Sequence, residues 1–180
     1  MSLKHPIIAV TGSSGAGTTT VKRVFENIFR REGIRAAVIE GDAFHRWPRS
    51  EMKARIAAAE RDGGRLSHFG PETNELELLE QQFRDYSATG RCRTRRYLHT
   101  EAEAAALGQE PGSFTAWADT PPDTDCLFYE GLHGCVRVGA IDLVRYADLK
   151  LGVVPIINLE WIQKIHRDRS TRGYSTEAVT

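Results

Sequence analysis

Residues 7–19 read IIAVTGSSGAGTT, and this stretch decides the fold. Its first four residues form a continuous apolar run, which has the composition of a buried β-strand. A glycine-rich segment follows at residues 11–17, and beyond it apolar side chains recur at helical spacing, at residues 21, 24, 25, 28 and 29. Gly33 then supplies a stop signal. We therefore predict the order strand, glycine loop, helix.

The rest of the chain alternates between short apolar runs and helical patterns, which favours an α/β fold with a mostly parallel sheet. Further strands are predicted at residues 36–40, 126–129 and 149–154. Further helices are predicted at residues 50–62, 72–86 and 159–169. Ser50 is the candidate N-cap of the first of these helices.

Length and composition restrict the class of protein. The chain has 180 residues, 41% of them hydrophobic, which fits a single domain over residues 1–180. Its 24 basic and 24 acidic residues balance, so the global positive field of a nucleic-acid or membrane-surface binder is absent. No apolar window is long enough to span a membrane, and we expect a cytoplasmic protein. A helical pattern begins at residues 173–180 and stops without a cap or polar tail, so we expect a C-terminally truncated piece of a longer protein.

The glycine segment has the spacing of a phosphate-binding loop, Gly12-x-x-x-x-Gly17-Thr18-Thr19. In such a loop backbone N–H groups wrap the phosphates of a nucleotide, and the last hydroxyl reaches Mg²⁺. The usual lysine position holds Thr18, and a plain glycine-rich turn is the alternative. A dinucleotide loop is rejected because its spacing requires glycine at residue 20. The predicted phosphate-binding residues are Gly12, Ser13, Ser14, Gly15, Ala16, Gly17, Thr18, Thr19 and Thr20.

Chemically capable side chains follow the predicted strands, and such residues converge at the carboxyl edge of a parallel sheet. Asp42 either accepts the proton of a substrate hydroxyl that attacks the γ-phosphate or is a turn residue. Glu130 is either an acid that coordinates Mg²⁺ or a cap. The group His45, Arg46 and Arg49 is either a solvated face or a site for an anionic substrate.

Two basic segments lie further along the chain. Lys164, Arg167 and Asp168 share one helix face, which either supplies the cation that the loop lacks or is an exposed, ion-paired surface. Residues 91–99 hold four arginines within six residues. A β-hairpin lining a sugar-phosphate pocket explains this stretch better than nucleic-acid contact does, because the chain is neutral overall. His133 is either a loop hydrogen-bonding residue or a ligand.

Four segments in this order resemble bacterial-type members of the phosphoribulokinase/uridine kinase family. They are TGSSGAGT at 11–18, EGDAFHR at 40–46, FYEGLHG at 128–134 and GVVPIINLEWIQKIHRDR at 152–169. The lysine-free loop is itself similar to the bacterial branch. The resemblance implies a P-loop NTPase-like fold, a parallel sheet flanked by helices with a substrate-side hairpin.

The resemblance also implies an activity, transfer of the ATP γ-phosphoryl group to O1 of D-ribulose 5-phosphate in the Calvin cycle. It implies Asp42 as general base and Lys164 and Arg167 as cations on the transferred group. Mg²⁺ would be held by Thr19, Glu130 and Asp168, with Asp168 also serving the catalytic arrangement. The sugar phosphate would be held by His45, Arg49, Tyr97, His99 and Arg172. Arg31 matches a position linked to activation by NADH, and a homo-oligomer is expected.

Two alternatives remain at this stage. One is another small-molecule P-loop kinase, of the uridine or pantothenate type, although those kinases usually keep the loop lysine. The other is a non-catalytic nucleotide-binding fragment. No nucleic-acid or membrane partner is expected.

Overall fold

The computed structural model describes residues 4–172 of the chain. Its centre is a four-stranded sheet in the order β2-β5-β1-β8. These strands are β1 (Ile7–Gly12), β2 (Ala36–Glu40), β5 (Cys126–Gly131) and β8 (Leu149–Val153). All three pairings between neighbours are parallel, which confirms the predicted mostly parallel sheet.

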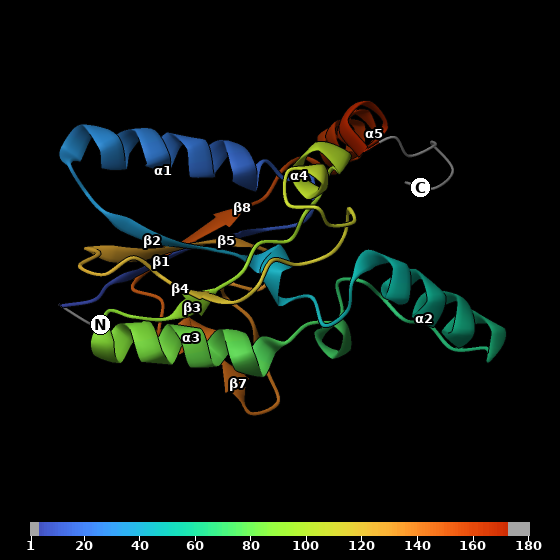
Figure 1. Ribbon diagram of the computed structural model, residues 1–180, viewed down its shortest axis with the longest axis horizontal. Helices are drawn as coiled ribbons and strands as arrows, with labels where there is room; N and C mark the ends of the chain where they lie inside the picture. Colours follow the sequence, from blue (N-terminus) through green and yellow to red (C-terminus); the bar gives the residue numbers. More distant parts are fainter. Residues whose placement is uncertain (1–3, 173–180) are drawn as a thin grey trace.

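One long helix covers each face of the sheet (Figure 1). α1 (Thr18–Glu32) follows the glycine loop and ends at Gly33, whose φ of 68° is a left-handed conformation that glycine adopts without strain. α3 (Leu76–Thr89) lies on the opposite face. The strand–loop–helix order predicted from residues 7–33 is confirmed.

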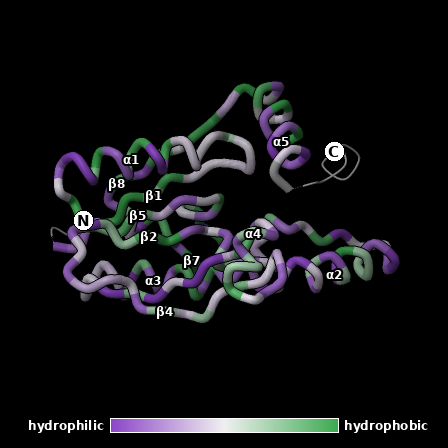
Figure 2. Tube along the Cα trace, turned by 45° about the horizontal axis from the view of Figure 1, so that its top comes forward, coloured by the Kyte–Doolittle hydropathy of each residue, from purple (hydrophilic) through white to green (hydrophobic). Residues whose placement is uncertain are grey.

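The core consists of two clusters, one on each side of the sheet, because successive side chains of a strand point to opposite faces. On the α3 side the rings of Tyr129 and Phe83 lie 5.5 Å apart. On the α1 side the rings of Phe128 and Phe25 lie 5.1 Å apart. Figure 2 shows the strands β1 and β5 as hydrophobic tubes between the two helix layers. Each fully buried ring of this kind stabilises the fold by about 1.5–3 kcal/mol.

The segment after β2 projects from the sheet edge. A short 3₁₀ turn, η1 (Gly41–Phe44), leads into α2 (Arg49–Arg61), which extends away from the body of the molecule (Figure 1). The prediction that Ser50 caps this helix is wrong, because the helix begins one residue earlier and Pro48 occupies the N-cap position. The fixed φ of proline suits the turn that precedes a helix.

The predicted helix at residues 72–86 is also wrong at its start. A 3₁₀ turn, η2 (Pro71–Thr73), comes first, and Asn74 is extended, with φ −124° and ψ 145°. Asn74 forms an isolated antiparallel bridge with His45, so its backbone is held by a distant segment instead of a helix. Tertiary pairing here outweighs the local helical pattern.

An antiparallel arm carries the arginine-rich stretch. β3 (Arg93–Thr94) pairs with β4 (Ala118–Asp119), and the long connection between them contains α4 (Glu101–Ala105), which begins with a capping box. The pairing is antiparallel, as in the predicted hairpin, but no tight turn joins its strands. A second small pair joins β6 (Arg137–Val138) to β7 (Ile141–Asp142) and leads into η3 (Leu143–Arg145).

The last described element is α5 (Ile157–Arg172), which follows β8 and lies across the carboxyl edge of the sheet (Figure 1). It contains the predicted helix at residues 159–169. Within residues 4–172, none of the helices combines the length and the apolar character that crossing a bilayer demands.

The backbones at the ends of β2 and β5 approach closely. A Cβ atom placed on Gly41 would lie 2.5 Å from Oη of Tyr129 and 3.1 Å from Cα of Gly131. Only glycine permits this approach, and it sets the position of the residues that follow each strand.

We therefore expect Gly41→Ala to destabilise the fold by about 1–3 kcal/mol, the usual cost of overpacking. Urea unfolding measures the change. Gly152→Ala is the matched control, because no atom lies within 4 Å of a Cβ at that position. Equal stability of the two variants would contradict the role given to this contact.

Candidate functional site

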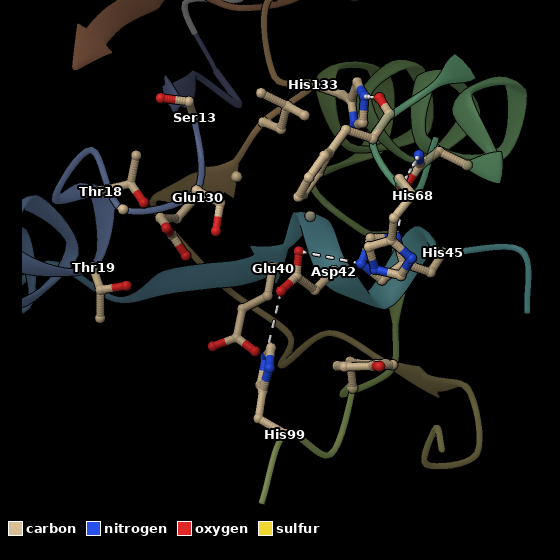
Figure 3. A pocket seen from close by; sticks show the side chains of 18 of the residues that line it. Ser13, Thr18, Thr19, Glu40, Asp42, His45, His68, His99, Glu130 and His133 are labelled. Carbon is tan, nitrogen blue, oxygen red and sulfur yellow. Dashed lines mark hydrogen bonds and ion pairs between the residues drawn. The ribbon is translucent and has the colours of Figure 1, made fainter. Parts of the chain in front are cut away.

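A pocket of about 650 Å³ opens at the carboxyl edge of the sheet (Figure 3). Most of the predicted site residues line it. From the glycine loop these are Gly12, Ser13, Ser14, Gly15, Thr18 and Thr19. From the rest of the chain they are Asp42, His45, Arg49, Tyr97, His99, Glu130, Lys164, Arg167 and Asp168.

The other predicted residues lie elsewhere. Within residues 4–172, Ala16, Gly17 and Thr20 do not line the pocket, although they belong to the loop and the first turn of α1. Arg31 is exposed near the end of α1, with its Nε 2.7 Å from Oε1 of Glu32. The side chain of Arg172 lies outside the part of the chain that can be described.

The loop is shaped to present backbone N–H groups. Gly15 and Gly17 have φ values of 95° and 97°, and the N–H of Ala16 donates to the Ser13 carbonyl at 3.0 Å. No side chain caps α1. The first turn of a helix leaves its N–H groups without partners inside the helix, and the helix dipole adds positive potential there. This geometry suits an anion such as a phosphate group.

Thr18, at the position of the usual loop lysine, contacts the acid at the end of β5. Its hydroxyl donates a hydrogen bond to the carboxylate of Glu130. Burial raises the pKa of Glu130 and the negative charge of Asp42 raises it further, while the Thr18 hydrogen bond opposes the shift. Glu130 therefore lies in a site where a negative charge is costly unless a cation compensates it.

Sequence analysis did not identify a cation that lies one helical turn after Thr18. Lys22 shares a face of α1 with Thr18, and its ammonium group forms a close ion pair with the carboxylate of Glu40. Glu40 is the register partner of Glu130 on the neighbouring strand. The i, i+4 spacing of Thr18 and Lys22 was the available signal, but the pairing with Glu40 depends on how α1 packs on the sheet.

Asp42 lies on η1 between two imidazole rings (Figure 3). Its Oδ1 is 3.5 Å from Nε2 of His45, and its Oδ2 is 3.5 Å from Nε2 of His99. The two rings arrive from segments far apart in the sequence, and each faces a different oxygen. A ring protonated at Nε2 would donate to the carboxylate oxygen that it faces, so the carboxylate lies between two potential hydrogen-bond donors.

Arg49, Tyr97 and His99 form a linked group beside this carboxylate. Nε of Arg49 donates to Oη of Tyr97 at 3.3 Å, and its Nη2 donates to the backbone carbonyl of His99 at 2.9 Å. The Tyr97 ring contacts the rings of His45 and His99, with centroids 5.4 and 4.9 Å away. Four of the five residues predicted for the sugar phosphate are thus gathered in one place.

α5 contacts the phosphate loop directly. Nη2 of Arg167 donates to Oγ of Ser14 at 3.1 Å, and its Nε donates to Oδ1 of Asp168 at 2.8 Å. Asp168 is only 5% exposed. Lys164 lies over the ring of Trp161, 5.4 Å from its centroid. The predicted helix face therefore points into the pocket rather than into open solvent.

Several residues around the pocket were not among the predicted site residues. Arg95, within the arginine-rich stretch, donates to the carbonyls of Ala43 and His45 at 2.8 and 3.0 Å and so braces the loop after β2. Nε2 of His133 lies 3.1 Å from the Phe69 carbonyl, and burial lowers the pKa of His133. Further polar and charged residues of the lining are Lys53, His68, Asn74, Arg96 and Glu103.

The parallel sheet, the glycine loop at a helix start and the acids at the neighbouring strand ends define a nucleotide-binding fold of the P-loop class. Residues 7–180 match the model of the phosphoribulokinase / uridine kinase family, and the chain belongs to that family.

Curated relatives agree with this assignment. Phosphoribulokinase 2 of Cereibacter sphaeroides is 62% identical to the whole chain, and the phosphoribulokinase of Rhizobium meliloti (strain 1021) is 60% identical. The match covers 62% of each relative, so the chain spans about three fifths of their length.

Solved structures show the same relationship. A phosphoribulokinase from Rhodobacter spheroides superposes with a TM-score of 0.83 and 56% identity, over 98% of this chain and 60% of that one. A possible uridine kinase from Bacillus stearothermophilus has a TM-score of 0.61 and 16% identity, over 96% of this chain and 85% of that one. The second likeness shows the fold alone.

The raised pKa of Glu130 predicts a pH-dependent effect on stability. Above its folded pKa the ionised side chain costs folding free energy, and this cost is lost as the pH falls below the unfolded value of about 4.3. Glu130→Gln should therefore raise Tm at pH 8, and the gain should shrink on acidification. Glu26→Gln, at an exposed position on α1, is the control. A gain that does not vary with pH would contradict this assignment.

Proposed function

We propose that the chain transfers the γ-phosphoryl group of ATP to O1 of D-ribulose 5-phosphate, which gives ribulose 1,5-bisphosphate in the Calvin cycle. The observation that carries the proposal is one pocket that gathers a phosphate loop, a flanked aspartate and cations from α5. The names of relatives about 60% identical to this chain support the choice of acceptor.

Asp42 is the proposed general base. Its carboxylate lies between His45 and His99 and lines the pocket, where we expect the acceptor hydroxyl to bind beside it. The sugar O1 proton would pass to Asp42 as O1 bonds to the γ-phosphorus and the bond to ADP breaks. Positioning contributes more here than basicity, because the transition state is loose.

The negative charge of the transferred phosphoryl group would be stabilised by the phosphate loop and by cations of α5. Backbone N–H groups at the start of α1 face the phosphates, and Arg167 already reaches the loop at Ser14. Lys164, one helical turn before Asp168, supplies a second cation on the same face. These two side chains perform the role that a loop lysine has in other P-loop proteins.

The donor set fits Mg²⁺, a hard cation that prefers oxygen ligands. The Thr19 hydroxyl and the carboxylates of Glu130 and Asp168 all line the pocket. When bound, Mg²⁺ would neutralise charge on the β- and γ-phosphates. Burial raises the pKa of Glu130, and a bound cation would oppose this shift because metal ligation favours the ionised carboxylate.

The 5-phosphate of the sugar would lie against Arg49 and the Tyr97–His99 arm. Arg172 is proposed as a further contact on the basis of the family resemblance. The same resemblance supports NADH activation through Arg31, a homo-oligomer and a cytoplasmic location. Each of these remains a proposal.

A phosphoryl-transfer assay tests the activity. The chain with MgATP should convert ribulose 5-phosphate and not uridine, and Asp42→Asn should lower kcat about 10²- to 10⁴-fold without weakening ATP binding. ADP release measures turnover, and calorimetry measures ATP affinity. Turnover of uridine alone, turnover of neither acceptor, or full turnover by the variant would each contradict the proposal.

The role of α5 is tested separately with Lys164→Met. Removing a cation that acts on the transition state should reduce kcat about 10²- to 10³-fold, with a smaller change in KM for ribulose 5-phosphate. Arg65→Met removes one positive charge at an exposed position outside the pocket lining and is the control. An effect confined to KM would show that Lys164 holds the sugar phosphate instead.

A further inference from the structure

The side chain of Asn74 is fixed by hydrogen bonds on both ends of its amide. The residue is 1% exposed. Its Nδ2 donates to the Gly70 carbonyl at 2.7 Å, and the His68 carbonyl and Oγ1 of Thr73 lie within 3.2 Å of the same nitrogen. On the opposite end, Oδ1 of Asn74 lies 2.8 Å from Nδ1 of His45.

These partners decide which way the amide points. Backbone carbonyls accept hydrogen bonds and never donate, so an amide turned by 180° would bring its oxygen against the carbonyl oxygens of Gly70 and His68. The Thr73 hydroxyl uses its one proton on a backbone carbonyl, Ser67 at 2.7 Å or Gly70 at 2.9 Å, and is therefore an acceptor toward Asn74. Oδ1 must face His45.

The orientation of Asn74 then decides the tautomer of His45. An amide oxygen only accepts, so Nδ1 of His45 must carry a hydrogen. His45 is 6% exposed, and its other nitrogen, Nε2, lies 3.5 Å from Oδ1 of Asp42. Gain and loss of a proton by His45 thus occur at Nε2, the atom that faces the pocket.

The backbone around Asn74 holds this contact in place. The Glu75 N–H donates to the Phe44 carbonyl at 2.7 Å, and the Arg46 N–H donates to the Thr73 carbonyl at 2.9 Å. The segment after η2 is therefore joined to the loop that carries Asp42 and His45. Asn74 belongs to this junction and not to the first turn of α3.

We propose that Asn74 is a positioning residue that holds His45 in its Nδ1–H form, so that Nε2 donates a hydrogen bond only when the ring is protonated. A neutral ring held in this form presents a lone pair to Asp42 and to any anion in the pocket. A ring free to change tautomer would keep an Nε2–H donor when neutral.

A kinetic consequence rests on the proposed function. Binding of an anionic sugar phosphate should be weaker when the His45 ring is neutral than when it is protonated, because the Nε2–H donor and its charge disappear together. The limit for one linked proton is about tenfold in KM per pH unit. Other titratable or charged groups around His45 are Asp42, His68, Tyr97, Arg95 and His133.

The tautomer is measured directly on the unaltered chain. Long-range ¹H–¹⁵N correlation spectra of the ring nitrogens, recorded while the His45 ring is neutral, should show a protonated Nδ1 and an unprotonated Nε2. A neutral ring with its hydrogen on Nε2 would overturn the inference. This result does not depend on which acceptor the chain phosphorylates, so it stands or fails apart from the proposed function.

The role of Asn74 is measured with variants. Asn74→Leu should shift the neutral ring toward its Nε2–H form and flatten the rise of KM for ribulose 5-phosphate with pH. Thr73→Val is the matched control, because it removes one partner of the Asn74 amide and leaves the contact with His45. The control should keep the wild-type tautomer and pH profile, since the two carbonyl partners still fix the amide.

Parallel pH profiles and an unchanged His45 tautomer in Asn74→Leu would show that Asn74 has only a structural role. The titratable and charged groups around His45 are the same in the unaltered chain, Asn74→Leu and Thr73→Val. A difference between their pH profiles is therefore due to the Asn74–His45 contact. If the leucine variant does not fold, the spectra of the unaltered chain still decide the tautomer.

Discussion

The close approach of two glycines at the sheet edge is the constraint on which the site depends. Gly41 directly follows β2 and Gly131 ends the neighbouring parallel strand β5, and a Cβ on either glycine would crowd the backbone of the other and the side chain of Tyr129. Because the backbone leaves the sheet at the same edge after β2 and after β5, Asp42 and Glu130 both line one pocket. The buried strands beneath them provide the rigidity that a catalytic geometry requires.

Because the ends of β2 and β5 converge, several acidic side chains lie close together in the pocket. Burial raises the pKa of Glu130, and the negative charges of Asp42 and Glu40 raise it further. Lys22 offsets part of this charge from within α1, whereas Arg167 and Lys164 arrive on α5, a separate element. These cations lie on two separate elements, α1 and α5, and none of them occupies the usual lysine position of the loop, which holds Thr18.

Residues from other segments orient the loop after β2, which carries Asp42 and His45. Asn74 and Arg95 reach the loop after β2 from two directions, one through the side chain of His45 and the other through backbone carbonyls. Arg95 is held over the ring of Phe114, with its guanidinium 3.8 Å from the centroid. The sequence pattern associates the arginine-rich stretch with a sugar-phosphate pocket, whereas Arg95 donates to backbone carbonyls of the loop after β2.

Residues 7–33 were enough to predict the strand, the phosphate loop and the helix, because apolar periodicity and glycine spacing are local properties. Asp42, Glu130 and the face of α5 were also accessible, since strand ends converge in any parallel sheet. The start of α3 was not, because Asn74 pairs with His45 across 29 residues of sequence and this pairing replaces a helical turn. The Lys22–Glu40 ion pair and the tautomer of His45 likewise depend on atoms that only packing brings together, and no local pattern records such contacts.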